Sequence, residues 1–181
     1  RVLFRSSAVV LNSGGANACT GPQGFADTHK TAELVAHKLD LSSSEVVVCS
    51  TGLIGELLPM NKIEAGIGAI SLDDQGFDSS AKAIMTTDSI PKRVTVTRNG
   101  ITTSGIAKGA GMLAPALATM LSVIMTDAVV DGEAAKEIFK RVVDQTFNRI
   151  DSDGCTSTND TVLFMASGRS EEHTSELQSH S

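Results

Sequence analysis

The chain has 181 residues, of which 41% are hydrophobic, 20% charged and only 3% aromatic, and its formal net charge at pH 7 is −6. This length fits one domain, or a domain with a fragment of another, and the composition suffices for an apolar core. The negative charge and the lack of Trp and Tyr argue against nucleic acid and anionic membranes as partners. No run of 18 apolar residues predicts a membrane span, and no secretory signal is recognised.

Both ends of the chain resemble translated sequencing adapters. Residues 1–6 read Arg-Val-Leu-Phe-Arg-Ser, and residues 169–181 lack an apolar period and helix caps. We therefore expect both ends to be artefacts and residues 7–168 to be a piece of a longer protein. The net charge stays at −6 without them, because three basic and three acidic residues are removed.

The first predicted elements are an apolar run and a helix. The run covers residues 8–11 and leads into a loop of small residues over 12–21. Helical spacing of apolar residues predicts a helix over 30–39. Asp27 or Thr28 is expected to cap it.

A buried strand and a second helix follow. The β-branched run 45–50 predicts the strand, and a glycine-rich turn is expected over 51–55. Pro59 suits the first position of the next helix. Three isoleucines are expected on one face of that helix: Ile63, Ile67 and Ile70.

A hairpin is the clearest prediction in the second half. After a short helix over 81–87, residues 93–98 alternate strictly, Asn99-Gly100 supplies a tight turn, and 101–107 return. The remaining expected elements are a loop over 108–111, strands over 120–125 and 162–166, a helix over 132–147 and a polar segment over 151–161. Three apolar residues of that helix are expected to face inward: Ile138, Val142 and Val143. Mixed strands and helices with a hairpin predict an α+β or mixed α/β fold.

The sequence lacks the common catalytic and metal-binding motifs. Cys19, Cys49 and Cys155 are far apart, which is typical of three reduced thiols rather than a metal or disulfide site. His29 and His37 lie on one predicted helix and are expected to be solvated. No Walker A, HExxH or GxSxG pattern occurs, and Gly109 and Gly111 do not complete a dinucleotide motif.

One segment permits a different chemistry. A glycine-rich loop beginning at Lys108 leads to Ala118 and Thr119, at the start of an apolar strand. The Thr119 hydroxyl could attack the Ala118 carbonyl, and hydrolysis of the resulting ester would leave an amino-terminal threonine. Its α-amine, with an ordinary pKa of about 7.7–8, could then act as base for its own hydroxyl. A threonine at a strand start is also common in structural roles, so the residues alone leave both readings open.

The sequence resembles the ornithine acetyltransferase family, also called bifunctional glutamate N-acetyltransferases. The matching stretches run in order through almost all of 7–168: Asn12-Ser-Gly-Gly-Ala-Asn-Ala-Cys-Thr-Gly21, Ser50-Thr-Gly-Leu-Ile-Gly55, Leu58-Pro-Met60, Thr86-Thr-Asp88, 108–121 and 153–160. Two positions depart from the family pattern. Gly15 stands where the family usually has Asn, and Cys155 where it is usually acidic.

The resemblance implies a role for each of several residues. Thr119 corresponds to the nucleophile and follows the cleaved Ala118–Thr119 bond. Thr51 and Gly52 match the oxyanion-hole pair. Three residues are implied to bind substrate: Thr86, Lys108 and Thr119. Thr87 is an adjacent alternative to Thr86, and three asparagines are either site-shaping or structural: Asn12, Asn17 and Asn159.

The resemblance also implies a layered α-β-β-α sandwich, incomplete here, and a reaction. Residues 7–118 would end the α chain and 119–168 would begin the β chain of a self-cleaved enzyme of arginine biosynthesis. Acetyl would pass from N-acetylornithine to Thr119 and then to glutamate, without metal or organic cofactor, and acetyl-CoA is a further candidate donor. The two chains would form a heterotetramer in the cytoplasm, or in the mitochondrial matrix of a eukaryote. The family's carboxy-terminal site residues are absent, so we expect this chain alone to be inactive.

Two other functions remain open from the sequence. A self-processing amino-terminal-nucleophile peptidase or amidase would use the same cut and transfer to water instead of glutamate. A non-catalytic α/β binding module would use Thr119 only as a strand residue.

Overall fold

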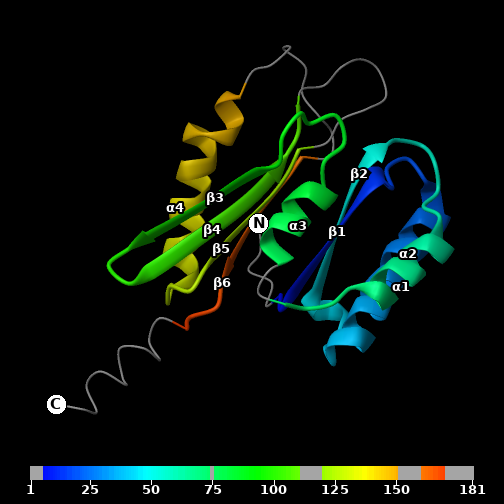
Figure 1. Cartoon of the computed structure of the whole chain (residues 1–181), viewed down its shortest axis with the longest axis horizontal. Coiled ribbons are helices and arrows are strands. Elements are labelled where there is room, and N and C mark those ends of the chain that lie inside the picture. The colour runs from blue at the N-terminus through cyan, green and yellow to red at the C-terminus, as the bar shows by residue number, and fades with distance from the viewer. Residues whose placement is uncertain (1–5, 74–75, 111–119, 151–159, 170–181) are drawn as a thin grey trace.

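Six strands form two sheets within residues 6–73, 76–110, 120–150 and 160–169, the part of the chain that the computed structural model describes (Figure 1). The first sheet pairs β1 (Ala8–Gly15) and β2 (Val46–Leu53) in parallel. The second has the order β3, β4, β5, β6, of which only β5 and β6 are parallel. Its strands span Lys92–Arg98, Ile101–Lys108, Leu121–Thr126 and Thr161–Ala166.

Helices connect the strands and cover the sheets. The α-helices are α1 (Gly21–Leu39), α2 (Met60–Ala69), α3 (Gly76–Ala83) and α4 (Gly132–Gln145). Two 3-10 turns are η1 (Ser43–Glu45) and η2 (Phe147–Arg149). Ser42 and Glu45 form a capping box at η1, directly before β2 begins at Val46.

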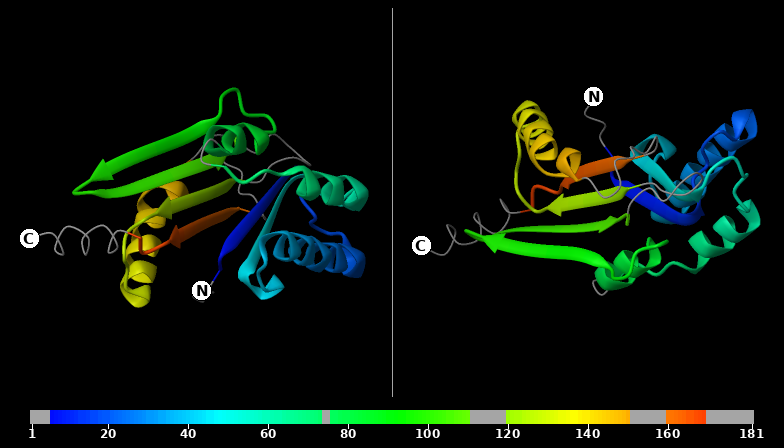
Figure 2. Two further views of the ribbon diagram at one scale, coloured as in Figure 1. Left: turned by 60° about the horizontal axis from the view of Figure 1, so that its bottom comes forward. Right: turned by 90° about the horizontal axis from the view of Figure 1, so that it is seen from above.

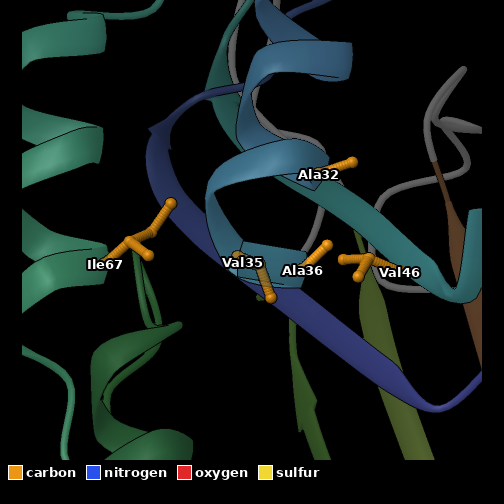
Figure 3. Packing of buried hydrophobic residues seen from close by; sticks show 5 residues of the cluster. All are labelled: Ala32, Val35, Ala36, Val46 and Ile67. Atoms are coloured by element: carbon orange, nitrogen blue, oxygen red, sulfur yellow. The ribbon is translucent and has the colours of Figure 1, made fainter. Parts of the chain in front are cut away.

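The inner layers are held by an apolar cluster on each face of β1 and β2. On the outer face, α1 and α2 contribute to a buried cluster of Ala32, Val35, Ala36, Val46 and Ile67 (Figure 3). On the inner face, Val9 and Leu11 pack against a second cluster that joins α3 to the four-stranded sheet. Its buried members are Ala81, Ile84, Ile106 and Val123.

The fourth layer is α4, on the other side of the four-stranded sheet from β1 (Figure 2). The ring of Phe139 lies 5.7 Å from the ring of Phe164 on β6, centroid to centroid. Leu163 and Met165 of β6 point the opposite way, into the cluster shared with β1. The resulting order of helices, sheet, sheet and helix is the predicted mixed α/β, layered α-β-β-α fold.

The predicted hairpin is confirmed. β3 and β4 pair antiparallel, with Arg98 opposite Ile101. Asn99 and Gly100 both adopt positive φ values, 52° and 78°. A two-residue turn with both central residues in this region matches the twist of the flanking strands, which is why Asn-Gly predicts it so well.

The start of the first helix was predicted wrongly. α1 begins at Gly21, nine residues before the expected start, with Pro22 in its first turn. Asp27 and Thr28 are therefore inside the helix rather than caps; Thr28 Oγ1 donates to the Gly24 carbonyl. The apolar period that guided the prediction begins only in the later turns, and the one large apolar side chain of the first two turns, Phe25, is 69% exposed.

The second and third helices are also displaced from their predicted positions. α2 begins after Pro59, which is its N-cap rather than its first residue. The helix ends before Ile70, whose side chain is 48% exposed. The short helix expected over 81–87 instead spans Gly76–Ala83.

The inward face of α4 was predicted wrongly in part. Ile138 and Val142 are 51% and 41% exposed, whereas Phe139 and Val143 are half-buried. The face toward the sheet is thus one position further along the helix. Apolar side chains are also exposed on β3, where Val94 and Val96 are 59% and 47% exposed.

We predict that Ile106→Ala destabilises the fold by about 2–5 kcal/mol, because Ile106 is only 4% exposed at the contact between the sheets and its loss leaves a cavity. Ile90→Ala, at a side chain 67% exposed, is the matched control and should change the free energy of unfolding by less than about 0.5 kcal/mol. Urea unfolding of both variants measures the difference; equal midpoints would contradict the assigned core.

Candidate active site

The end of β2 carries the predicted oxyanion-hole pair. The expected turn over 51–55 is wrong at its start, because the ladder with β1 continues: Thr51 pairs with Ser13 and Gly52 with Gly14. Pairing keeps Thr51 on the face of the sheet that looks toward the four-stranded sheet, and it is fully buried.

The backbone at Gly52 requires glycine. Its φ is +129°, and a Cβ there would lie 2.4 Å from the carbonyl carbon of Gly14. Both features exclude any side chain. Two strands therefore approach closely at this point, next to the Thr51 hydroxyl.

Lys108 brings three of the predicted site residues together. It is the last residue of β4 and is only 2% exposed. Its ammonium donates to Thr51 Oγ1 at 3.0 Å and to Thr86 Oγ1 at 2.8 Å. The two acceptors are 57 and 22 residues away in sequence, so this cation joins both sheets and the segment after α3.

Of the two adjacent threonines, Thr86 rather than Thr87 contacts Lys108. Both residues are exposed, but the hydrogen bond from Lys108 goes to the Thr86 hydroxyl. The lysine contact thus favours Thr86 as the site member of this pair.

Asp88 joins this cluster of candidate site residues, although the sequence alone predicts no role for it beyond its place at the end of the motif Thr86-Thr-Asp88. Its Oδ1 accepts the Gly109 N–H at 2.8 Å and a hydrogen bond from the Lys92 ammonium, and its Oδ2 accepts the Thr86 N–H at 3.3 Å. Burial raises the pKa of this carboxyl, but the hydrogen bonds from Lys92, Gly109 and Thr86 outweigh burial, so its pKa lies below the ordinary value. A signal was present in the sequence: an acidic residue directly after two candidate hydroxyls.

Opposing charges act on the Lys108 ammonium. Burial lowers its pKa, the nearby Lys92 lowers it further, and Asp88 and Asp160 raise it; the net direction is downward. Among the described residues no carboxylate forms an ion pair with Lys108. A buried ammonium that donates to two hydroxyls, and has no directly paired carboxylate among the described residues, is suited to receive an anionic group.

The start of β5 lies beside the Lys108 corner. The Met120 N–H donates to Asp160 Oδ1 at 2.8 Å, and a Cβ on Gly109 would lie 3.4 Å from Met120 Cα. Lys108 is paired with Leu121 in the ladder. The predicted nucleophile Thr119 and the cleavage partner Ala118 lie outside the described residues.

The loop after β1 is held by its asparagines. Asn12 donates to the Gly15 carbonyl at 3.1 Å and accepts from Ser50 Oγ at 2.6 Å. Asn17, with φ 48°, donates to the Gly24 carbonyl and to Thr28 Oγ1. Both asparagines therefore hydrogen-bond to the surrounding backbone and hydroxyls in the manner of structural turn residues. Asn159 lies outside the described residues.

Gly15, one of the two expected departures from the family pattern, lies against the Leu58 side chain. A Cβ at this position would lie 2.7 Å from Leu58 Cδ2, so the Leu58 side chain fills the space that a larger residue would need. Cys155, the second departure, lies outside the described residues.

The histidines of α1 and the cysteines Cys19 and Cys49 differ in their exposure to solvent. His29 and His37 are exposed on α1. Cys19 is exposed, whereas burial raises the pKa of the Cys49 thiol to about 11, so this thiol is protonated at neutral pH.

The described residues contain no group of three His, Cys, Asp or Glu side chains that could hold a metal ion. None of their helices combines the length and the apolar character needed to cross a bilayer.

The fold and site together define a class: layered α/β proteins with a buried lysine and hydroxyls between two sheets. The sequence profile of the ArgJ family matches residues 2–180, and the chain belongs to this family. It is 59% identical over 167 residues to the arginine biosynthesis bifunctional protein ArgJ of Streptomyces avermitilis, covering 91% of this chain and 44% of that protein. The same protein of Mycobacterium tuberculosis is 53% identical over 177 residues, covering 92% and 44%.

Solved structures agree with the layered fold. A crystal structure of ornithine acetyltransferase from Mycobacterium tuberculosis, in complex with ornithine, superimposes with a TM-score of 0.54 and 55% identity over 61% of this chain and 62% of that chain. The arginine biosynthesis bifunctional protein ArgJ of Bacillus halodurans gives a TM-score of 0.54 and 38% identity over 59% of each chain. The chain spans about 44% of the length of the curated relatives it matches.

We predict that Gly52→Ala destabilises the fold by about 2 kcal/mol or more, because it combines a left-handed φ with a backbone clash. The control is Gly66→Ala in α2, where a Cβ meets nothing within 4 Å and φ is unstrained; it should stabilise by up to about 1 kcal/mol. Urea midpoints of the two variants should move in opposite directions, and a shift in the same direction would contradict the close approach of β1 and β2.

Proposed function

We propose that this chain is part of a self-cleaving acetyltransferase that moves acetyl from N-acetylornithine to glutamate. The observation that carries the proposal is the pair of hydrogen bonds from Lys108 to Thr51 and Thr86. These three residues come from separate segments, and the family resemblance assigns each to oxyanion stabilisation or substrate binding. Membership of the ArgJ family and the ornithine complex of a 55% identical relative support the same reaction.

The first step of the proposed mechanism is self-cleavage. Thr119 Oγ attacks the Ala118 carbonyl, the peptide nitrogen leaves as the new α-amine, and water hydrolyses the ester. Residues 119 onward then begin with a threonine whose amine, with an ordinary pKa of about 7.7–8, can take the proton from its own hydroxyl. Two observations support this assignment: Met120, the residue after Thr119, lies against Gly109, and Leu121 pairs with Lys108.

Acetyl transfer follows in two half-reactions. Thr119 Oγ attacks the acetyl carbonyl of N-acetylornithine, and ornithine leaves with the proton that the α-amine had taken. The glutamate amine then attacks the acetyl-threonine ester, giving N-acetylglutamate and regenerating the hydroxyl. Each half-reaction passes through a tetrahedral oxyanion, for which Thr51 and Gly52 are the proposed donors.

The contact with Lys108 suits Thr51 for this role. Thr51 Oγ1 accepts the lysine hydrogen bond, so its own hydrogen must point to a different acceptor. Donation from a cation polarises the hydroxyl and strengthens the bond that it can donate. Burial fixes the hydroxyl, so little reorganisation is needed when charge develops.

Lys108 is the proposed anchor for the substrate carboxylate, with Thr86 beside it. N-acetylornithine and glutamate both carry an α-carboxylate, so one cation serves both half-reactions. The negative net charge of the chain does not oppose this, because binding depends on the local ammonium.

We further propose that residues beyond this chain complete the site, since the chain spans less than half of its relatives. The chain alone is then inactive, and the cleaved halves assemble into a heterotetramer. Acetyl-CoA as a second donor stays part of the proposal. The bacterial relatives favour the cytoplasm over a mitochondrial matrix.

We predict that the full-length protein from the parent gene is recovered as two chains, the second beginning with Thr119. Thr119→Ala should leave a single uncut chain because it removes the attacking oxygen, whereas Thr119→Ser keeps a hydroxyl and should still cleave. Intact-mass measurement distinguishes them. A single chain in the folded unmodified protein would remove the base from the mechanism and favour a binding module.

We predict that Thr51→Val lowers kcat for acetyl transfer by about 10²–10³, the usual effect of losing one oxyanion donor. Thr95→Val is the matched control, because Thr95 is exposed on β3 and its hydroxyl pairs with the Ser104 hydroxyl at 2.9 Å, outside the candidate site. The assay follows N-acetylglutamate formed from N-acetylornithine and glutamate. An unchanged kcat would reject the oxyanion role, and release of acetate instead of N-acetylglutamate would identify a hydrolase.

A further inference from the structure

Asp88 lies at the centre of the hydrogen bonds beside Lys108. Its two carboxylate oxygens accept from Gly109 N–H, Thr86 N–H and the Lys92 ammonium. The Asp88 side chain is only 1% exposed, whereas that of Lys92 is 43% exposed. The carboxylate is therefore held by protein donors rather than by water.

Two of these donors flank the hydrogen bond between Lys108 and Thr86. Gly109 follows Lys108 in the chain, and the Thr86 N–H belongs to the same residue as the hydroxyl that accepts from Lys108. One carboxylate thus fixes the backbone on both sides of that bond.

The carboxylate also compensates charge. Asp88 raises the pKa of Lys108, acting against the burial that lowers it. Lys92 pairs with Asp88 from the solvent side. Its own positive charge acts in the opposite direction to that of Asp88 and lowers the pKa of Lys108.

We propose that Asp88 is a positioning residue for substrate binding: it holds Thr86 and Lys108 at the spacing that receives the amino-acid carboxylate and supplies the countercharge for the buried ammonium. This inference rests on the proposed function and names how the substrate end of that site is built. Asp88 does not touch the reacting atoms, so its removal should weaken binding more than chemistry.

The experiment uses Asp88→Asn in the full-length enzyme, with Asp78→Asn as control. Asp78→Asn removes the same charge from α3, but the Asp78 side chain is 55% exposed and pairs with Arg93 at 3.0 Å. Ornithine binding is measured by calorimetry, and KM and kcat for N-acetylornithine by the transfer assay. Self-cleavage is read by intact mass and folding by thermal unfolding.

For Asp88→Asn we expect the Kd for ornithine and the KM for N-acetylornithine to rise about tenfold, with kcat changed by less than about threefold and cleavage retained. Binding requires the protonated lysine, so affinity is present below the Lys108 pKa and lost above it. Because the Asp88 charge raises that pKa, affinity in the variant should be lost at a lower pH than in the unmodified enzyme. Asp78→Asn should change none of these quantities.

A lower melting temperature with unchanged Kd and pH dependence would make Asp88 merely structural and overturn the inference. If Asp88→Asn does not fold, Asp88→Glu keeps the charge but displaces both oxygens by one methylene; a Kd raised at least about threefold supports the inference, and an unchanged Kd overturns it. An unmodified enzyme without acetyl transfer or ornithine binding would instead overturn the proposed function, and this inference with it.

Discussion

The buried ammonium of Lys108 is the interaction on which the candidate site depends. It lies at the end of β4 and reaches Thr51 at the end of β2, so it joins the two sheets where their apolar contact ends. A cation in such a place is costly unless hydrogen bonds and countercharge compensate it. The hydroxyls of Thr51 and Thr86 supply the hydrogen bonds, and Asp88 supplies the countercharge. Because Thr86 and Asp88 both follow α3, the same interactions also position that segment.

The packing explains why the polar groups can meet at this point. Below Lys108 on the same face of β4, Ile106 belongs to the cluster that Val9 and Leu11 of β1 also contact. That apolar contact sets the distance between the sheets. Gly14 and Gly52 approach closely, so the pairing of β1 with β2 continues beyond the apolar cluster. This continued pairing places Thr51 next to Lys108.

Local patterns predicted the fold well where a short segment dictates its own geometry. Asn99-Gly100 gave the hairpin because both residues tolerate positive φ. The β-branched run of β2 gave a strand, but its end was wrong, since Thr51 and Gly52 stay extended only through pairing with β1. The start of α1 was missed because its first turns do not bear the apolar stripe, and the inward face of α4 because Phe139, not Ile138, meets β6.

The sequence by itself determined the fold class, the hairpin and, through its motifs, the family whose chemistry Thr119, Thr51, Gly52, Thr86 and Lys108 are proposed to perform. The choice of Thr86 over Thr87, the burial of Lys108 and the part taken by Asp88 were decided only by the tertiary structure. The reason is physical: a motif specifies residue types and local geometry, whereas desolvation and charge compensation depend on groups from distant segments. Lys108 and Thr51 are 57 residues apart, and only the stacking of two sheets brings them within 3.0 Å.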